Sequence, residues 1–207
     1  MQTLKLVAVS AGLSSPSSTR LLTDRLLQAA RYRLAEQEYA VDVQVVELRD
    51  LAVDIAKNLV TGFPSGRLQE AIDAVTGADG VIAVTPVFTA SYSGLFKSFF
   101  DLIDPAALTG TPVLIGATGG TARHSLVLDH ALRPLFAYLR ALVAPTAVYA
   151  ASEDWGSGGD DYTDGLPSRV NRAGREFADM VAARPGRRDD EDEIVPFERQ
   201  LADLRLD

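Results

Sequence analysis

Short apolar runs alternate with segments of helical periodicity along most of the chain. Runs rich in Val, Ile, Leu and Ala, each stopped by glycine, proline or polar residues, are typical of strands in a sheet. They predict five strands, over 4–10, 41–48, 81–85, 111–117 and 143–150. Apolar residues at helical spacing predict helices over 17–38, 68–76, 94–103, 122–142 and 168–183. Pro134 can kink the fourth of these helices.

This alternation indicates an α/β fold, in which helices cover both faces of a parallel sheet. The regular pattern ends near residue 183, so we expect one domain over 1–183 and a charged C-terminal tail over 184–207. Ligands of such sheets bind beyond the carboxyl ends of the strands. The loops that follow Ser10, Thr85, Ala117 and Ala150 are therefore the places where chemistry is expected.

Composition narrows the function classes. The chain has 207 residues, of which 47% are hydrophobic and 23% charged, as in an ordinary globular domain. Its net charge of -8 disfavours nucleic-acid binding, which depends on Lys and Arg. The absence of cysteine excludes disulfides, thiol redox chemistry and Cys-ligated metals. The two histidines, His124 and His130, form no metal-ligand pattern with neighbouring carboxylates, so no metal site is expected.

No apolar stretch approaches the roughly 18 residues that a transmembrane helix needs, so no membrane association is expected. The first residues, Met1 to Val7, lead directly into a strand pattern without a basic leader. The expected location is therefore the cytoplasm.

The first loop, SAGLSSPSST over 10–19, is rich in hydroxyl groups and lacks positive charge. It matches neither a dinucleotide-binding GxGxxG nor a P-loop. Backbone N–H groups at a helix start, assisted by Ser and Thr hydroxyls, can nevertheless hold a phosphate. A serine-rich turn before an ordinary helix cap explains the same residues, so this loop alone does not decide between the two.

The second loop, TPVFTASYSGLFK over 85–97, places aromatic and small residues between a strand and a helix start. A flat ring system could lie against it, or its aromatics could simply fill the core. The core explanation suits the phenylalanines at 96, 99 and 100. Phe88 and Tyr92 lie at the carboxyl end of the strand and are better candidates for a ligand contact.

The third loop, ATGGTARH over 117–124, contains a Gly-Gly pair. Such a pair lets the backbone approach a ligand closely, although it also ends strands without any ligand. His124, in the first turn of the next helix, is by default a capping or solvated residue. Arg123 could meet a nucleotide 2′-phosphate or serve as a surface ion-pair partner, so the sequence leaves NADH and NADPH open.

Together, the second loop, the segment 117–121 and the segment DHALRP over 129–134 resemble the NAD(P)H-dependent FMN reductases of flavodoxin-like fold. The similarity extends from about residue 4 to about residue 150. It is greatest to reductase components of two-component alkanesulfonate monooxygenases, and it includes reductases paired with luciferase-like monooxygenases. The resemblance implies a three-layer sandwich with a five-stranded parallel sheet in the order 2-1-3-4-5.

The resemblance also implies a set of FMN-binding residues. The phosphate would be held by the hydroxyls of Ser10, Ser15, Ser17, Ser18 and Thr19. The isoalloxazine ring would be lined by Pro86, Val87 and Phe88, and its pocket closed by Tyr92, Ser93 and Gly94. Backbone contacts to the polar edge of the ring would come from Thr118, Gly119 and Gly120. Close relatives often carry Tyr in place of Phe88, so that hydroxyl is missing here while stacking is retained.

The implied reaction is hydride transfer from NADPH or NADH to FMN, chemistry that the cofactors themselves carry. It requires no side-chain acid or base, so no catalytic residue is predicted. The expected partner is a flavin-dependent monooxygenase that receives reduced flavin. Three alternatives stay open: a flavodoxin-type electron carrier in which Trp155 shields the flavin, a quinone or azo reductase, and a flavin-free interaction module.

Two features suggest assembly. The segment 122–142 carries more leucine than one stripe against a sheet needs, which predicts a homodimer or homotetramer that shares its flavin sites. The tail combines an acidic run, Asp189 to Glu193, with later apolar residues, which is unlike a purely disordered segment. We expect the tail to pack on a neighbouring subunit or to bind a monooxygenase, and not to build the flavin pocket.

Overall fold

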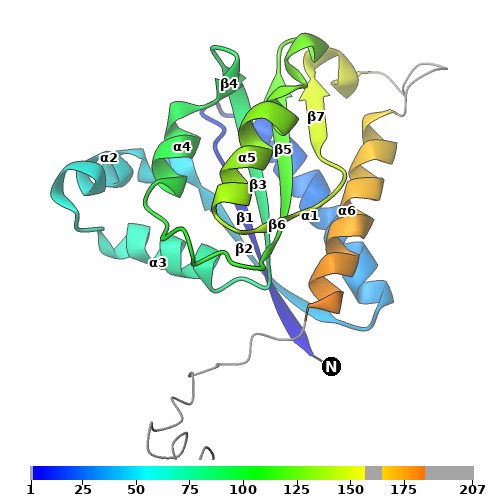
Figure 1. Ribbon diagram of the computed structural model, residues 1–207. Coiled ribbons are helices and arrows are strands. Elements are labelled where there is room, and N and C mark those ends of the chain that lie inside the picture. Colours follow the sequence, from blue (N-terminus) through cyan, green and yellow to red (C-terminus); the bar gives the residue numbers. More distant parts are fainter. Residues whose placement is uncertain (1, 157–164, 185–207) are drawn as a thin grey trace, which may run out of the picture.

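The computed structural model describes residues 2–156 and 165–184, in which a sheet lies between two layers of helices (Figure 1). The strands pair in the order β2-β1-β3-β5-β6, while β4 pairs with β3 and β7 with β5. All pairs are parallel except β3 with β4. The strands are β1 (Thr3–Ser10), β2 (Ala40–Glu47), β3 (Gly80–Phe88), β4 (Ser91–Tyr92), β5 (Pro112–Gly119), β6 (Leu142–Val143) and β7 (Val148–Ala151).

The α/β class and the parallel core are confirmed, but the expected count of five strands is wrong. The described residues form seven strands because the fifth expected strand is interrupted and β4 was not expected. At the interruption, Arg133 donates to the carbonyl oxygens of Ala144 and Pro145 at 3.1 Å each. The Thr146 N–H is bonded to the Glu176 carboxylate at 2.9 Å. These backbone groups are bonded to side chains, so β6 and β7 pair with β5 as separate pieces.

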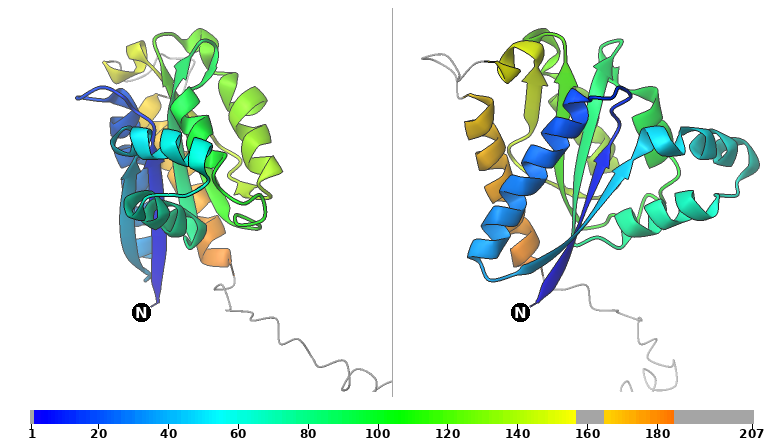
Figure 2. Two further views of the ribbon diagram at one scale, coloured as in Figure 1. Left: turned by 90° about the vertical axis from the view of Figure 1, so that its left-hand side faces the viewer. Right: turned by 180° about the vertical axis from the view of Figure 1, so that it is seen from behind.

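Helices cover the two faces of the sheet in separate groups (Figure 2). On one face, α1 (Ser18–Glu36) and α6 (Leu166–Ala183) pack side by side. The other face carries α2 (Ala52–Thr61), α3 (Gly66–Thr76), α4 (Gly94–Phe100) and α5 (Arg133–Tyr138). Each face has its own hydrophobic cluster, centred on Leu22, Leu26 and Phe177 in the first and on Phe96, Phe100 and Phe136 in the second.

The expected continuous helix over 122–142 is wrong. The segment consists of the 3-10 turn η2 (Ala122–His124), the π-helical turn η3 (Leu128–Leu132) and α5. Pro134 has no N–H with which to continue the regular i→i−4 hydrogen bonds, and a π turn lies directly before it. The last residue of the expected helix, Leu142, instead begins β6.

The other expected helices lie close to their predicted positions. Ser17 caps α1 as predicted, since its hydroxyl accepts a hydrogen bond from the Arg20 N–H. The helix α2 was not expected because Leu51 precedes it without a capping side chain and only Ile55 of its residues is buried. The 3-10 turns η1 (Leu48–Leu51) and η4 (Ser152–Trp155) complete the described elements.

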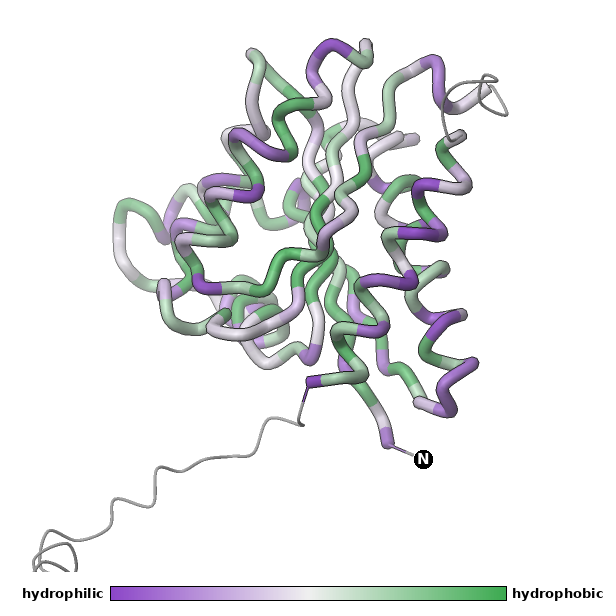
Figure 3. The backbone as a smooth tube through the Cα atoms, turned by 45° about the vertical axis from the view of Figure 1, so that its right-hand side comes forward, coloured by the Kyte–Doolittle hydropathy of each residue, from purple (hydrophilic) through white to green (hydrophobic). Residues whose placement is uncertain are grey.

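Hydrophobic residues concentrate along the central strands, and hydrophilic residues recur along the outer helices (Figure 3). Among the described helices, none is both long and apolar enough to span a membrane. The expected boundary at residue 183 coincides with the end of α6. The tail beyond Arg184 and most of the polar loop 153–165 lie outside the described residues, so the division into domain and tail stays a prediction.

Candidate functional site

The first three candidate loops meet at the carboxyl edge of the sheet, where the central strands end (Figure 1). Strand register shows how they are aligned: Ser10 is opposite Val84, and Pro86 is opposite Thr118. Gly119 is opposite Ala151, so the loop after β7 starts beside them. The structure therefore brings the predicted segments together from three separate parts of the chain.

The first loop wraps closely around the start of α1. A Cβ atom at Gly12 would lie 2.1 Å from the Ser17 hydroxyl, so a larger residue would displace the hydroxyl that caps α1. Ser15 and Ser18 are exposed, and Ser17 is partly exposed. The first turn of α1 contains no acidic residue, which favours an anion there.

Two other hydroxyls of the first loop are buried. Thr19 shares a 2.8 Å hydrogen bond with Thr118, which links the start of α1 to the end of β5. Ser10 follows Leu6 and Ala8 on the face that α1 covers, and its hydroxyl has no hydrogen-bond partner. A buried polar group without a partner is uncommon in proteins, so Ser10 is suited to a ligand.

The second loop forms a tight hairpin between β3 and β4. Val87 pairs with Tyr92 and Phe88 with Ser91, so only Thr89 and Ala90 make the turn. Both have positive φ, at 48° and 66°, as a type I′ turn requires, although neither is a glycine. Non-glycine residues in this region are strained, and such strain often occurs at functional sites.

The hairpin displays some of its residues and buries others. Phe88 is 48% exposed, whereas Pro86 is buried and Val87 partly buried. Ser93 is buried. Its N–H donates to the Thr85 hydroxyl at 3.0 Å, and its own hydroxyl caps α4 by accepting from the Phe96 N–H. Tyr92 packs on the core with its ring 6.0 Å from that of Phe96, and Gly94 is exposed.

The third loop is supported by Tyr149, which sequence reasoning missed. A Cβ atom at Gly119 would lie 2.1 Å from the Tyr149 Oη. That hydroxyl donates to the Thr121 carbonyl at 2.8 Å. Burial raises the pKa of Tyr149 above its ordinary value of 10.0, with smaller contributions from Asp154 and Glu153. Within a strand of small apolar residues, a lone tyrosine gives no signal other than core packing.

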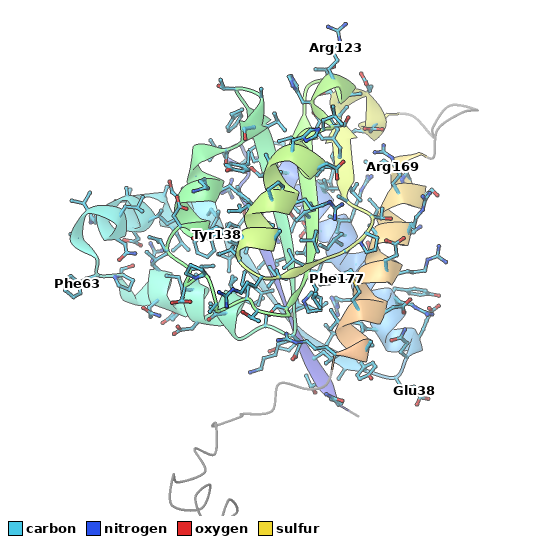
Figure 4. All side chains as sticks on the ribbon, viewed as in Figure 1. Glu38, Phe63, Arg123, Tyr138, Arg169 and Phe177 are labelled. Carbon is cyan, nitrogen blue, oxygen red and sulfur yellow. The ribbon has the colours of Figure 1, made fainter. Side chains whose placement is uncertain are left out.

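A further polar network fixes β7 beneath this loop. Arg169 of α6 donates to the Tyr149 carbonyl at 2.6 Å and pairs with Asp154 at 2.5 Å. The Ala151 N–H donates to the same aspartate at 2.7 Å. Figure 4 shows Arg169 on α6 close to the end of β7, and Arg123 projecting away from the protein at the sheet's carboxyl edge.

The described residues contain no cluster of His, Asp or Glu that could hold a metal ion, and both His124 and His130 are exposed. Residues 4–156 match the family described as NADPH-dependent FMN reductase. The chain belongs to this family. The resemblance predicted from the loops is confirmed, and with it the enzyme class, an NAD(P)H-dependent FMN reductase.

Relatives of this FMN reductase family member carry matching names. It is 40% identical over 183 residues to FMN reductase (NADPH) from Pseudomonas aeruginosa, covering 87% of this chain and 94% of that protein. It is 38% identical over 180 residues to NADH-dependent FMN reductase SfnF from Pseudomonas fluorescens, covering 86% and 91%. An oxidoreductase structure from Corynebacterium diphtheriae has a TM-score of 0.84 at 43% identity, covering 89% of this chain and all of the other.

The geometry of this family member suits FMN. One end of the sheet edge carries groups that could donate to a phosphate: the unpaired Ser10 hydroxyl, the exposed serines and the first N–H groups of α1, whose first turn has no acidic residue. Gly120 has no heavy atom within 4 Å of its would-be Cβ, so the backbone there can approach a ring. An apolar wall, Pro86 to Phe88, lies on the neighbouring strand.

Proposed function

We propose that this protein reduces FMN with NADPH or NADH at the carboxyl edge of its sheet, and that it supplies reduced flavin to a monooxygenase. The observation that supports this site best is the buried, unpartnered Ser10 hydroxyl on the face covered by α1. When bound, FMN supplies the hydride-accepting chemistry. The residues of the protein bind and orient it.

The FMN phosphate would lie at the start of α1. The hydroxyls of Ser10, Ser15, Ser17 and Ser18 would donate to it together with the first backbone N–H groups of the helix. The nearest basic side chain of that turn, Arg20, is already bonded to Asp24 and Glu47. Within that turn, binding would therefore depend on hydroxyl and backbone donors; a basic side chain in contact with the loop is Arg49, which donates to the Ser14 carbonyl at 3.0 Å. Thr19 would position the helix through Thr118 and would not contact the phosphate with a free hydroxyl.

The isoalloxazine ring would lie between the β3 hairpin and the glycine loop. Pro86, Val87 and Phe88 would line it, with the half-exposed Phe88 ring available for stacking. Backbone N–H groups at Gly119 and Gly120 would face its polar edge and stabilise negative charge that develops on reduction. Because the cofactors themselves carry the hydride chemistry, no side-chain acid or base is required.

The nicotinamide must stack on the exposed side of the flavin ring at near-attack distance. One relative is named for NADPH and another for NADH, so either nucleotide could be the hydride donor. Arg123 is exposed at the sheet edge and could pair with a 2′-phosphate. Replacing it with Ser would then raise the KM for NADPH and leave that for NADH unchanged.

We also propose a homodimer or homotetramer in which α5 contributes to the interface. A groove of about 660 Å³ lies between α4 and α5, where Lys97, His130 and Tyr138 are among the lining residues. Tyr138 is 71% exposed and Leu142 is 53% exposed. Large exposed hydrophobic side chains such as these support the proposal that this side of the protein forms an interface.

The deciding experiment is steady-state oxidation of NADPH and of NADH, with and without added FMN. We expect oxidation that depends on FMN and exceeds the rate with quinones or azo dyes. An electron carrier would bind FMN without oxidising either nucleotide. A quinone or azo reductase would prefer those acceptors, and protein that fails to bind FMN would favour an interaction module.

A further inference from the structure

A long groove runs between α1 and α6, on the surface that faces away from the sheet. Its volume is about 1040 Å³, and it is separate from the loops at the carboxyl edge. The two helices pack side by side beneath it, because Gly174 allows an approach in which a Cβ atom would lie 2.5 Å from the Ala29 Cβ (Figure 1). Its charged or aromatic lining residues are Arg25, Tyr32, Arg33, Glu36 and Arg175.

The groove carries surplus positive charge in a protein of net charge -8. Arg33 is bonded to Asp179 at 2.9 Å and to Glu36 at 3.4 Å. Arg25 and Arg175 take part in no salt bridge within residues 2–156 and 165–184. The Arg25 guanidinium lies 5.0 Å from the centre of the Trp155 ring. This cation–π contact holds the side chain in place while leaving its charge available to an anion.

The sequence that follows α6 has the complementary charge. Helix α6 ends at Ala183, and Pro185-Gly186 follows two residues later. Pro-Gly is a turn dipeptide that can reverse the chain. The five residues from Asp189 to Glu193 are all acidic.

The reach of the chain is sufficient for this run to meet the groove. Asp189 lies five positions after Arg184, which an extended chain spans in about 17 Å, and Glu193 lies nine positions after it, which corresponds to about 30 Å. Measured back along α6 at 1.5 Å per residue, Arg175 lies about 13 Å and Asn171 about 20 Å from Arg184. An extended chain that turned back at Pro185-Gly186 would therefore be long enough to pass both positions.

We propose that the acidic run Asp189–Glu193 binds in the α1–α6 groove of its own chain, with carboxylates on Arg25 and Arg175. A single exposed ion pair would contribute little. Tethering by a few residues raises the effective concentration of the run, so several weak pairs act together. The occupant is thus a segment of the same chain, whereas a neighbouring subunit and a monooxygenase become outcomes that the test can reveal.

The natural absence of cysteine allows a direct test in the full-length protein. Asn171→Cys is combined with Glu191→Cys, and mild oxidation is followed by non-reducing electrophoresis and mass spectrometry. Asn171 is an exposed groove residue. The control pairs Glu191→Cys with Glu70→Cys, an exposed position on α3 over the other face of the sheet.

We expect an intramolecular disulfide at position 171 to form several times faster than at position 70. About 1 M NaCl, where the screening length falls to about 3 Å, should remove the difference. The double variant Arg25→Ser with Arg175→Ser should also remove the difference in rate. The charge-conserving double variant Arg25→Lys with Arg175→Lys should retain it.

Equal rates at positions 171 and 70 would overturn the proposal, as would a rate at 171 that salt does not change. A disulfide that joins two chains would show that the run docks on a neighbouring copy. If Glu191→Cys reacted no faster with position 171 than with position 70 and was protected from oxidation only after a monooxygenase was added, the run would be placed on that partner and the proposal would be overturned. Because both labelled positions are exposed and FMN binding can be measured on each variant, a folding defect would be recognised separately.

Discussion

Gly119 and Tyr149 provide a sharp test of how the third loop is held. In Gly119→Ala, the new Cβ would lie 2.1 Å from the Tyr149 Oη and 3.2 Å from its Cζ. The φ angle of Gly119 is not in the positive range, so alanine strains no backbone angle there and the cost is steric. Tyr149 is only 4% exposed and has little room to move. Overpacking of this kind costs about 1–3 kcal/mol.

Tyr149→Phe removes the clashing oxygen and with it the 2.8 Å hydrogen bond to the Thr121 carbonyl. The loss of that bond should cost about 1 kcal/mol. In the double variant the nearest remaining atom is Cζ at 3.2 Å, which a small shift of the ring accommodates. The double variant should therefore be about 1–2 kcal/mol more stable than the sum of the two single effects predicts.

The assay is urea unfolding of the four proteins without FMN, followed by FMN titration of each. Gly120→Ala is the matched control, because no heavy atom lies within 4 Å of its would-be Cβ, and it should change stability by less than about 0.5 kcal/mol. FMN affinity should fall in Gly119→Ala and recover in the double variant. Additive effects within about 0.5 kcal/mol would refute the steric explanation.

The pH dependence offers an independent check on the same hydroxyl. Burial raises the pKa of Tyr149 above 10.0, so the folded protein keeps its proton more tightly than the unfolded chain does. The stability from this group is complete below pH 10 and is lost as the pH rises through the folded pKa. Wild-type protein should therefore lose more stability than Tyr149→Phe above pH 10. Parallel losses in the two proteins would contradict this.

Three further predictions concern the first loop, the hairpin and assembly. Ser17→Ala with Ser18→Ala should weaken FMN at least about tenfold, since bonds to a charged group contribute about 1.5–3 kcal/mol each, and leave riboflavin nearly unchanged; equal weakening in titrations of both ligands would remove the loop from the phosphate site. Ala90→Gly should stabilise the protein by about 0.5–1 kcal/mol in thermal unfolding, because φ at Ala90 is 66°, and a lower Tm would contradict a strained turn. Sizing with light scattering should show a dimer or tetramer, and a monomer at micromolar concentration would exclude the proposed interface.

The sheet could be predicted because its signals are local. The runs that became β1 and β5 are apolar and end at a serine and a glycine, and Ser17 marks the start of α1. The run that became β3 was found as well, but the strand continues through Pro86 to Phe88, beyond its predicted end at Thr85. The prediction of one continuous helix over 122–142 was wrong because the interruption depends on contacts outside the segment. Its leucines keep a helical period, while Pro134 and the bonds from Arg133 to the next loop interrupt the backbone. Periodicity reports buried faces and does not report such interruptions.

The sequence predicted which segments form the candidate site. It did not predict the hydrogen bonds that hold these segments in place. The hairpin depends on positive φ at Thr89 and Ala90, which non-glycine residues seldom adopt, so no sequence signal announces β4. The Thr19–Thr118 bond joins residues 99 positions apart. Ser93 was predicted as a ligand contact, but it is buried and both its N–H and its hydroxyl are bonded within the loop. Only tertiary structure separates hydroxyls that hold the loops from hydroxyls that are left for a ligand.

That separation explains how a site made of loops can be rigid. In each of the three loops, a hydroxyl from one part of the chain fixes another: Thr19 with Thr118, Thr85 with Ser93, and Tyr149 with Thr121. Different groups in the same loops, such as the Ser10 hydroxyl, have no such bond. Because the holding bonds are made before any ligand arrives, less ordering entropy would be lost if the proposed donors bind FMN. A reductase whose chemistry requires only the alignment of two rings gains its rate from this fixed geometry.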